Sequence, residues 1–393
     1  MQRRHFLRSG AALTSLSPLG AALANGEAAP AVTAGARPPF SAPGALAPVR
    51  ARPDRLIDIA VCTRPFRPQG PRIEAERRHG RTIVHNYGHG GSGWSLSWGS
   101  AQAALPLILA TREKHVAVVG CGAIGLTTAR VAQRAGLRVR IYAKDRPPEV
   151  RSSAATGVWS PDSRICTEEH ATPEFMPRWE AMARGSFKVY QSLLGLPGDP
   201  VEWRDGYVLS DLPFDQPLPP PAIEDIEPDY PDLESRIRDL WPRSQLLQPH
   251  QHPFAVPHVR RYTQMMFNLA SYSRLLMDDF MRDGGEIEQR EFAHPRQFAS
   301  LKERTVVNAT GYGARALFGD ETIVPVRGQT ARLIPQPEVN YNLIYRGHNL
   351  VMVSRREGVL VQAQGERDFG DDSTAPDRAL SEAAVGRLAQ LFA

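Results

Sequence analysis

Two glycine-rich segments hold the residue types that could bind a cofactor or do chemistry. The first reads Val119-Gly120-Cys121-Gly122-Ala123-Ile124-Gly125 and has the GxGxxG spacing. Glycines at these positions let the chain turn tightly after a strand, let the backbone approach a pyrophosphate and let the next helix pack closely. Asp145 follows about 20 positions later, where an acidic residue can bind a ribose hydroxyl. The spacing predicts a dinucleotide site for FAD or NAD, with a phosphate-free glycine turn as the structural alternative.

The second segment, residues 85–99, reads His-Asn-Tyr-Gly-His-Gly-Gly-Ser-Gly-Trp-Ser-Leu-Ser-Trp-Gly. His85 and His89 are four residues apart and would share a face if the segment were helical. The three glycines at positions 88, 90 and 91 oppose a helix, and no third metal ligand follows at a suitable spacing. We therefore expect a loop rather than a metal site.

The elements around the first segment form a βαβ pattern. We expect a buried strand at His115–Val119, a helix at Ile124–Ala135 that ends at Gly136, and a further strand at Arg138–Tyr142. Elsewhere, apolar patterning predicts strands at 57–61, 81–85 and 305–311 and helices at 100–112, 178–194, 267–283 and 379–392. Residues 166–260 are rich in proline and read as mostly irregular.

With Arg64-Pro65, Val158-Trp159 and the strand end Asn308–Gly311, the 85–99 loop resembles the D-amino-acid oxidase family of flavoenzymes. The resemblance extends from about residue 55 to residue 390. In that family the GxGxxG element opens the chain and the glycine-rich loop closes it, whereas here the loop comes first. The chain is therefore similar to a circularly permuted member, which is physically reasonable because the termini of a domain are often neighbours at its surface.

The resemblance implies an α/β fold with a Rossmann-like FAD-binding domain and a mixed-sheet substrate domain, in permuted order. We expect seven segments, of which the resemblance implies the last five: a signal peptide (1–24), a linker (25–50), a segment equivalent to the family's C-terminal part (51–111), the FAD-binding βαβ unit (112–165), a mainly substrate-domain segment (166–304), a return to the FAD domain (305–330), and further substrate domain with a C-terminal helix (331–393).

The resemblance also implies which residues hold FAD. The family's acidic ribose position aligns with Lys144, and Asp145 follows one position later, so the ribose partner stays open between them. The remaining expected positions belong to the glycine turn, the pyrophosphate and isoalloxazine contacts, the adenine contact, the strand end under the flavin, and the glycine-rich loop: Gly120, Gly122, Ala123, Ile124, Gly125, Ser152, Ser153, Thr156, Gly157, Val158, Phe292, Thr310, Gly93, Trp94 and Ser95.

Three residues carry the expected substrate contacts. Arg64 matches the arginine whose guanidinium forms a bidentate pair with the substrate carboxylate, and Arg67 is the alternative. Gly91 matches the position whose carbonyl holds the substrate amine. Tyr262 is our candidate for a second carboxylate partner, with a packed core tyrosine as the ordinary alternative.

The implied function is oxidative deamination of D-amino acids: hydride passes from Cα to flavin N5, and the product hydrolyses to a 2-oxo acid and ammonia. Oxygen or another acceptor would reoxidise the flavin. An amine, glycine or D-aspartate oxidase or dehydrogenase of the same family is the alternative. An NAD-dependent dehydrogenase is a weaker alternative, because it would use the GxGxxG motif but leave the 85–99 loop without a role. An exported flavoprotein that has no catalytic activity is a further alternative.

The start of the chain predicts export. Arg3 and Arg4 precede a small, apolar stretch that ends in Ala22-Leu23-Ala24, a pattern typical of a twin-arginine signal peptide. We therefore expect a periplasmic or secreted protein that uses the twin-arginine export machinery. The apolar stretch is too short for a membrane anchor. Three of the five net positive charges come from this segment, so the remaining +2 does not indicate a nucleic-acid partner.

Overall fold

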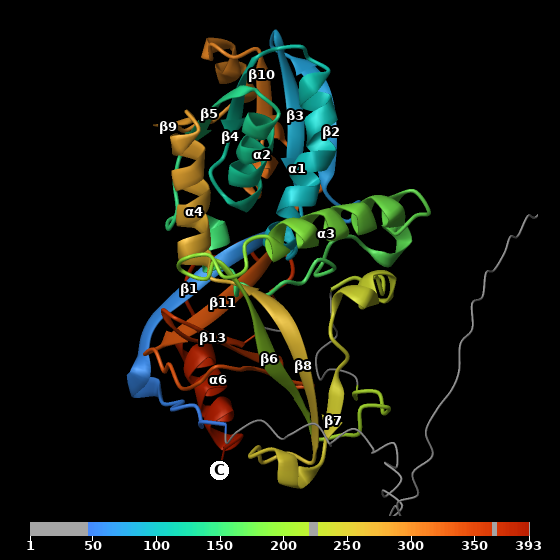
Figure 1. Ribbon diagram of the computed structural model, residues 1–393, viewed down its shortest axis with the longest axis vertical. Coiled ribbons are helices and arrows are strands. Elements are labelled where there is room, and N and C mark those ends of the chain that lie inside the picture. The colour runs from blue at the N-terminus through green and yellow to red at the C-terminus, as the bar shows by residue number, and fades with distance from the viewer. Residues whose placement is uncertain (1–45, 220–226, 364–367, 393) are drawn as a thin grey trace, which may run out of the picture. The chain divides into compact units, whose positions relative to one another are not determined.

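The computed structural model describes residues 46–219, 227–363 and 368–392 (Figure 1). The expected signal peptide and residues 25–45 of the expected linker lie outside these ranges. A six-stranded sheet contains the glycine turn, and β2 pairs antiparallel with β3 while every other neighbouring pair is parallel. Its order is β2 (Arg72–Arg78), β3 (Arg81–Tyr87), β10 (Thr305–Asn308), β4 (His115–Val119), β5 (Arg138–Ala143) and β9 (Glu286–Gln289).

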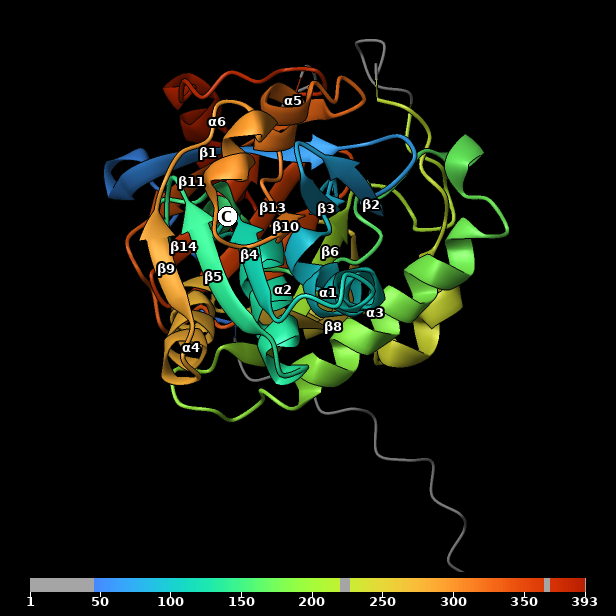
Figure 2. The same ribbon diagram turned by 90° about the horizontal axis from the view of Figure 1, so that it is seen from above.

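Both faces of this sheet are buried. On β4, Val116 and Val118 face one core, and Ala117 and Val119 face another. Because side chains alternate across a strand, this apolar run fits a strand that is covered on both sides. Figure 2 shows α1 and α2 side by side beneath the strands. The first core contains α1 (Gly93–Leu109), α2 (Ala123–Arg134), α3 (Phe175–Gln191) and α4 (Leu269–Arg282), and the second contains α5 (Gly313–Phe318).

The second sheet has eight strands and is mixed, because β12 pairs parallel with β6 while its other pairs are antiparallel. Its order is β1 (Leu56–Phe66), β11 (Val324–Leu333), β14 (Gly358–Ala363), β13 (Leu350–Arg355), β12 (Asn342–Tyr345), β6 (Val201–Ser210), β8 (His258–Phe267) and β7 (Gln245–Leu247).

One face of the eight-stranded sheet packs against α6 (Arg378–Gln390), and the other lines a cavity. On β13, Leu350 and Met352 belong to the core that includes α6, whereas Val351 and Val353 line the cavity. The two-residue period therefore gives this sheet one structural face and one face available to a ligand.

The predicted βαβ unit is confirmed as β4, α2 and β5, with bounds within one residue of those expected. The helix expected at 100–112 instead begins at Gly93, so the tryptophan-rich end of the glycine-rich loop is helical. The irregular reading of residues 166–260 is wrong at β6 and at the start of β8, which pair over ten residues. Both strands contain a run of four half-buried residues, and charged side chains lie within it, so the usual alternation is hidden.

Some expected segment boundaries also need correction. Val49 is buried in the core of the eight-stranded sheet, so residues 46–50 belong to the folded body rather than to a linker. Within 166–304, α4 packs on α2 and β9 extends the six-stranded sheet. Within 305–330, β11 already pairs with β1 in the other sheet. Across the described ranges, no helix is long and apolar enough to span a membrane.

Candidate active site

The GxGxxG motif forms the turn from β4 into α2. Gly120 has a φ of +114°, and a Cβ atom there would lie 2.4 Å from the Ala309 carbonyl oxygen. A Cβ on Gly125 would lie 2.0 Å from the Gly120 carbonyl oxygen. Gly122 is the N-cap of α2 and has no side chain that could cap the helix. The turn therefore needs its glycines, and it presents the amino end of α2 to a ligand.

The glycine-rich loop leads directly into α1, whose first residue is Gly93. Gly90 has a φ of +53°, and a Cβ there would lie 1.9 Å from the Arg164 carbonyl oxygen. The Gly91 amide donates to the Ser163 carbonyl at 3.0 Å. The N-cap residue Ser92 makes no capping bond and instead donates its hydroxyl to the same carbonyl. The loop is thus clamped on residues 163–164, and the N-cap residue of α1 leaves the first amides of that helix without its side chain.

Both helix ends open on one cavity of about 890 Å³, which also reaches the ligand face of the eight-stranded sheet. Most of the FAD and substrate residues expected from the sequence line it. They are Arg64, Gly91, Gly93, Trp94, Gly120, Gly122, Ala123, Ile124, Lys144, Asp145, Ser152, Thr156, Val158, Tyr262, Phe292 and Thr310. Residues far apart in the sequence therefore meet at one site.

Four expected positions do not line the cavity. Gly125 packs against Gly120 behind the turn, and Ser153 donates its amide to the Val150 carbonyl. Ser95 is buried, and its hydroxyl accepts from the Ser160 amide at 2.8 Å. Gly157 has a φ of +81°, and its carbonyl accepts from the Phe267 amide at 2.7 Å. These residues shape the wall, so their expected direct contact with FAD is not supported by the structure.

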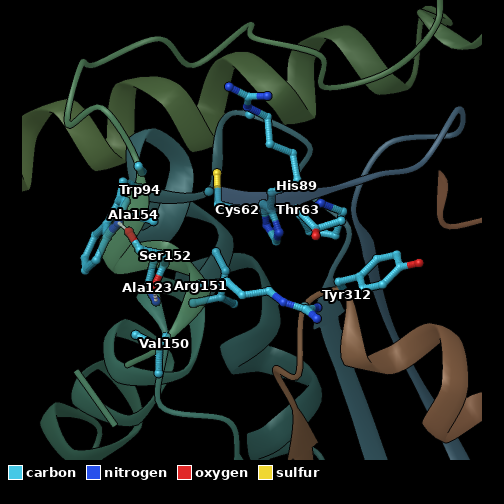
Figure 3. A pocket seen from close by; sticks show the side chains of 18 of the residues that line it. Cys62, Thr63, His89, Trp94, Ala123, Val150, Arg151, Ser152, Ala154 and Tyr312 are labelled. Atoms are coloured by element: carbon cyan, nitrogen blue, oxygen red, sulfur yellow. Dashed lines mark hydrogen bonds between the residues drawn. The ribbon is translucent and has the colours of Figure 1, made fainter. Parts of the chain in front are cut away.

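Ser152 ties the two helix ends together. Its hydroxyl accepts from the Ala123 amide at 3.1 Å, and its carbonyl accepts from the Trp94 indole nitrogen at 2.8 Å. Figure 3 shows Ser152 between Trp94 and Ala123 on the cavity wall, with Arg151 extending toward Tyr312. The Arg151 guanidinium carbon lies 4.9 Å from the centre of the Tyr312 ring. One short segment therefore connects the wall residues of α1 and α2.

Two carboxylates line the cavity near the end of β5. Lys144 and Asp145 are exposed lining residues, and Lys144 forms a 2.9 Å salt bridge with Glu291. The hydrogen bond from Lys144 to Glu291 raises the pKa of the lysine. Glu291 also lines the cavity, next to Phe292. The structure therefore adds Glu291 to Asp145 as a residue able to bind ribose hydroxyls, with Lys144 as the bridge to it.

Arg64 lines the same cavity from β1. Its Nη1 donates to the Arg327 carbonyl oxygen at 2.8 Å, and no salt bridge to it occurs in the part of the chain that is described. Burial lowers the pKa of Arg64. By contrast, Arg67 does not line the cavity and pairs with Asp320 at 3.3 Å. Arg64 rather than Arg67 is therefore the guanidinium available to a bound anion.

Tyr262 projects from β8 into the same cavity. Its ring packs over Gly206, where a Cβ atom would lie 2.4 Å from the ring carbon Cζ. The hydroxyl is buried and has no hydrogen-bond partner among the described residues. Burial raises the pKa of Tyr262, so the group remains a neutral phenol. An unpartnered buried hydroxyl in a cavity is suited to a ligand oxygen.

The two histidines of the loop have structural partners. His85 Nδ1 lies 3.1 Å from the Asn308 amide nitrogen, and His89 Nε2 lies 2.7 Å from the Ser100 hydroxyl. Burial is the main cause that lowers the pKa of His85 to about 4 and that of His89 to about 3. Both are therefore neutral near pH 7. In the ranges that the structure describes, no three histidine, cysteine or acidic side chains gather as metal ligands.

Sequence reasoning missed several lining residues. Polar side chains reach the cavity from the eight-stranded sheet, and Arg164 reaches it from the loop after Trp159. The sheet residues lie on strands whose pairing depends on distant segments, so no local motif marks them. They are Gln264, Thr330, Asn342 and Gln362.

Comparison with known proteins identifies the family. A protein-family model described as FAD dependent oxidoreductase (DAO) matches residues 115–393. A D-amino-acid oxidase from Streptomyces coelicolor is 30% identical over 291 residues, which cover 71% of this chain and 78% of that protein. A D-amino-acid oxidase from Dictyostelium discoideum is 28% identical over 281 residues, covering 70% and 72%.

Among solved structures, an L-amino acid deaminase from Proteus vulgaris is similar, with a TM-score of 0.45 and 15% identity over 71% of this chain and 75% of that one. The family match covers more than half of the sequence and includes the glycine turn described above. The chain belongs to the DAO family of FAD-dependent oxidoreductases.

Proposed function

We propose that this chain oxidises D-amino acids to 2-oxo acids and ammonia. The observation that carries the proposal is that a guanidinium without a salt bridge among the described residues, Arg64, and a phenol without a partner among them, Tyr262, both line the cofactor cavity. Such a pair is complementary to a carboxylate. The D-amino-acid oxidases among the similar proteins support the same substrate class.

The cavity fits FAD by its own features. Its volume of about 890 Å³ lies in the range for large ligands, the amino ends of two helices open on it, and Gly120 and Gly125 admit no side chain. The amides near Gly122 and Ala123 and the adjacent Ser152 would hold the pyrophosphate. Asp145 and Glu291 would hold the ribose. Bound FAD supplies the hydride acceptor that the protein side chains lack.

The side chains at the substrate end can bind and orient an amino acid. Arg64 would pair with the carboxylate, Tyr262 would donate to the same group, and the Gly91 carbonyl would accept from the amine. Among the lining residues, the carboxylates are Asp145 and Glu291, at the ribose end beside Lys144. His89 is a weak base because burial lowers its pKa to about 3. Positioning of the Cα–H bond, rather than proton abstraction by a side chain, therefore accounts for catalysis.

Membership of the FAD-dependent family removes the NAD-dependent dehydrogenase from the alternatives. Two alternatives remain. An amine, glycine or D-aspartate oxidase or dehydrogenase would differ in the substrate that it oxidises. A flavoprotein without turnover would form no product from any of them. The test is to purify the chain, extract and identify its cofactor, and assay D- and L-enantiomers for 2-oxo acid and ammonia. Release of both products from D-enantiomers supports the proposal, and activity restricted to L-enantiomers or simple amines contradicts it.

The chain order supports a circular permutation. The family match begins at residue 115, while β1, β2 and β3 precede it and join the same two sheets. Leu46 and Phe392 both pack against the core of the eight-stranded sheet. A chain reopened between Arg112 and Glu113, with 392 linked to 46, should fold and retain FAD. Failure of that chain to fold, while the original binds FAD, would oppose this part of the proposal.

We also propose that the chain is exported by the twin-arginine route, on the strength of Arg3, Arg4 and the apolar stretch after them. Replacing both arginines with lysine in the full chain should leave the enzyme in the cytoplasm with its FAD. Unchanged export of that variant would contradict the proposed route.

A further inference from the structure

A polar cavity of about 310 Å³ lies at the end of the six-stranded sheet opposite the cofactor cavity. The parallel strands β3, β10 and β4 begin at this end, whereas residues at or just after their carboxyl ends line the cofactor cavity. The two cavities have no lining residue in common among the described residues. Apart from a glycine of the β2–β3 turn, the lining consists of three arginines, two threonines and one glutamate: Arg77, Arg81, Arg304, Thr82, Thr111 and Glu113. A ligand here would therefore bind away from the flavin chemistry.

Hydrogen bonds hold the segments around this cavity together. The Thr82 amide donates to the Arg304 carbonyl at 3.0 Å, which joins β3 to the start of β10. The Thr305 hydroxyl donates to the Thr111 hydroxyl at 2.8 Å, which joins β10 to the connection between α1 and β4. The Thr111 hydroxyl in turn donates to the Ile108 carbonyl at 2.7 Å. The walls are therefore fixed before a ligand binds, which lowers the entropic cost of binding.

Two of the lining arginines have no side-chain partner. Arg77 and Arg304 are exposed, and within the described ranges neither side chain forms a hydrogen bond or a salt bridge. Arg77 lies directly opposite Thr82 in the antiparallel β2–β3 pair, so the two side chains lie on the same face of the sheet. The Thr82 hydroxyl forms no hydrogen bond within these ranges either. Two guanidinium forks and one hydroxyl are therefore available to an anion.

Arg81 adds a fixed positive charge. Its Nη2 donates to the Ala299 and Leu301 carbonyl oxygens at 2.7 and 2.8 Å, which anchors the guanidinium. Its Nε is buried and has no hydrogen-bond partner among the described residues. Because carbonyl oxygens are neutral, they do not compensate the charge of the guanidinium, so Arg81 favours a nearby anion.

The lining of the cavity carries a positive charge. Glu113 is its carboxylate, so three arginines and one glutamate give a formal charge of +2. Glu113 forms no salt bridge in the part of the chain that is described. The acidic residues next to the arginines are engaged elsewhere: Glu76 Oε1 lies 3.3 Å from His85 Nε2, and Glu303 accepts from the Tyr142 hydroxyl at 3.1 Å. An anion with two negative charges would therefore match this cavity.

We propose that this cavity binds a phosphate group, supplied by a small phosphorylated molecule or by inorganic phosphate, through Arg77, Arg304 and the Thr82 hydroxyl. A phosphate group carries close to two negative charges near pH 7 and has several strong acceptor oxygens. The forked arginine side chain fits such oxygens in pairs. The volume of about 310 Å³ is at the lower end of the usual range for small-molecule sites, so a small organic group would also fit. Bound phosphate would stabilise the junction of β2, β3, β10 and the α1–β4 connection.

The test titrates the FAD-loaded chain with inorganic phosphate and with glycerol phosphate, using chloride to keep the ionic strength constant. Calorimetry measures the dissociation constant, and the melting temperature reports stabilisation. We expect saturable binding of at least one of the two compounds with a Kd of about 1 mM or below, together with a higher melting temperature. Tighter binding of glycerol phosphate identifies an organic phosphate as the ligand, and equal or weaker binding of it identifies inorganic phosphate.

Substitutions locate the binding. Arg77→Gln and Arg304→Gln should each weaken phosphate binding by about 10-fold or more, because each removes a charge-assisted hydrogen bond. Glu113→Gln should tighten binding several-fold, since it removes the competing carboxylate. Arg274→Gln is the matched control: it removes the same charge from an exposed arginine of α4 that has no partner among the described residues, and it should leave binding unchanged. FAD content and the melting temperature without phosphate verify folding.

The absence of saturable binding for both phosphate compounds would overturn the inference. Binding that Arg77→Gln and Arg304→Gln leave unchanged, or that Arg274→Gln weakens equally, would overturn it as well. These measurements do not depend on turnover, so their failure would leave the proposed oxidation of D-amino acids untouched.

Discussion

Replacing Arg64 with alanine should separate substrate binding from cofactor binding. In the structure its guanidinium donates to the Arg327 carbonyl at 2.8 Å and forms no salt bridge within the described ranges, so its removal leaves no internal carboxylate unpaired. Truncating one partner of a desolvated charge pair costs about 3–5 kcal/mol. That corresponds to a fall in kcat/KM of about 10² to 10⁴ for D-amino acids.

Arg64→Lys should recover only part of this loss. Lysine keeps the positive charge, but it lacks the planar fork that can hold both carboxylate oxygens and fix the Cα–H bond. We therefore expect kcat to fall as well as KM to rise. Steady-state kinetics on FAD-loaded protein measures both constants, and the flavin absorbance verifies the loading.

Arg67→Ala is the contrasting variant. Arg67 pairs with Asp320 away from the cavity, so its loss should lower the melting temperature while the folded enzyme keeps its kcat/KM. The reasoning about this site is refuted if Arg64→Ala retains nearly full activity with FAD bound, or if Arg67→Ala alone abolishes turnover without loss of folding.

The remaining predictions concern the phenol, the glycine turn and the histidines. Tyr262→Phe should lower kcat/KM about 10-fold, yet leave the melting temperature unchanged or higher, because the hydroxyl is buried without a partner among the described residues; a clear loss of stability would contradict this. Gly122→Val should abolish FAD retention, because a Cβ there already lies 3.2 Å from the Ser152 hydroxyl, whereas Gly386→Ala on α6 has open space and should retain FAD. Since burial lowers the pKa of His85 to about 4 and of His89 to about 3, the folded chain binds fewer protons than the unfolded chain below about pH 6.5. Stability should therefore fall as the pH drops from about 6.5 toward 4, and melting curves that do not shift over this range would argue against buried neutral histidines.

The sequence predicts the glycine turn and the βαβ unit around it well because their signals are local. A side chain at Gly125 would clash with the backbone of Gly120 in the same turn, so this requirement for glycine is local. A side chain at Gly120 would clash with the backbone of Ala309, which lies beside the turn. The β4–α2–β5 unit is equally local, with a doubly buried strand that reads as a continuous apolar run.

The substrate half is only partly predictable. Arg64 is found because it precedes Pro65 in a recognisable segment, but Gln264 and Thr330 reach the cavity through strand register that is set by distant partners. β8 lies in a region that reads as irregular because its first half, with Arg260 and Arg261, is only partly buried. Arg164 gives no sequence signal, because its place in the cavity wall depends on a backbone with positive φ and on Glu227, which is 63 positions away.

The proposed oxidation of D-amino acids is tested most directly by mixing the FAD-loaded chain with D-alanine in the absence of oxygen and following the flavin absorbance in a single turnover. The account predicts that D-alanine bleaches the flavin, that L-alanine does not, and that deuterium at Cα slows the bleaching several-fold because this bond is the one that breaks. A flavin that stays oxidised with every D-amino acid tested, or that L-alanine bleaches equally fast, would contradict it.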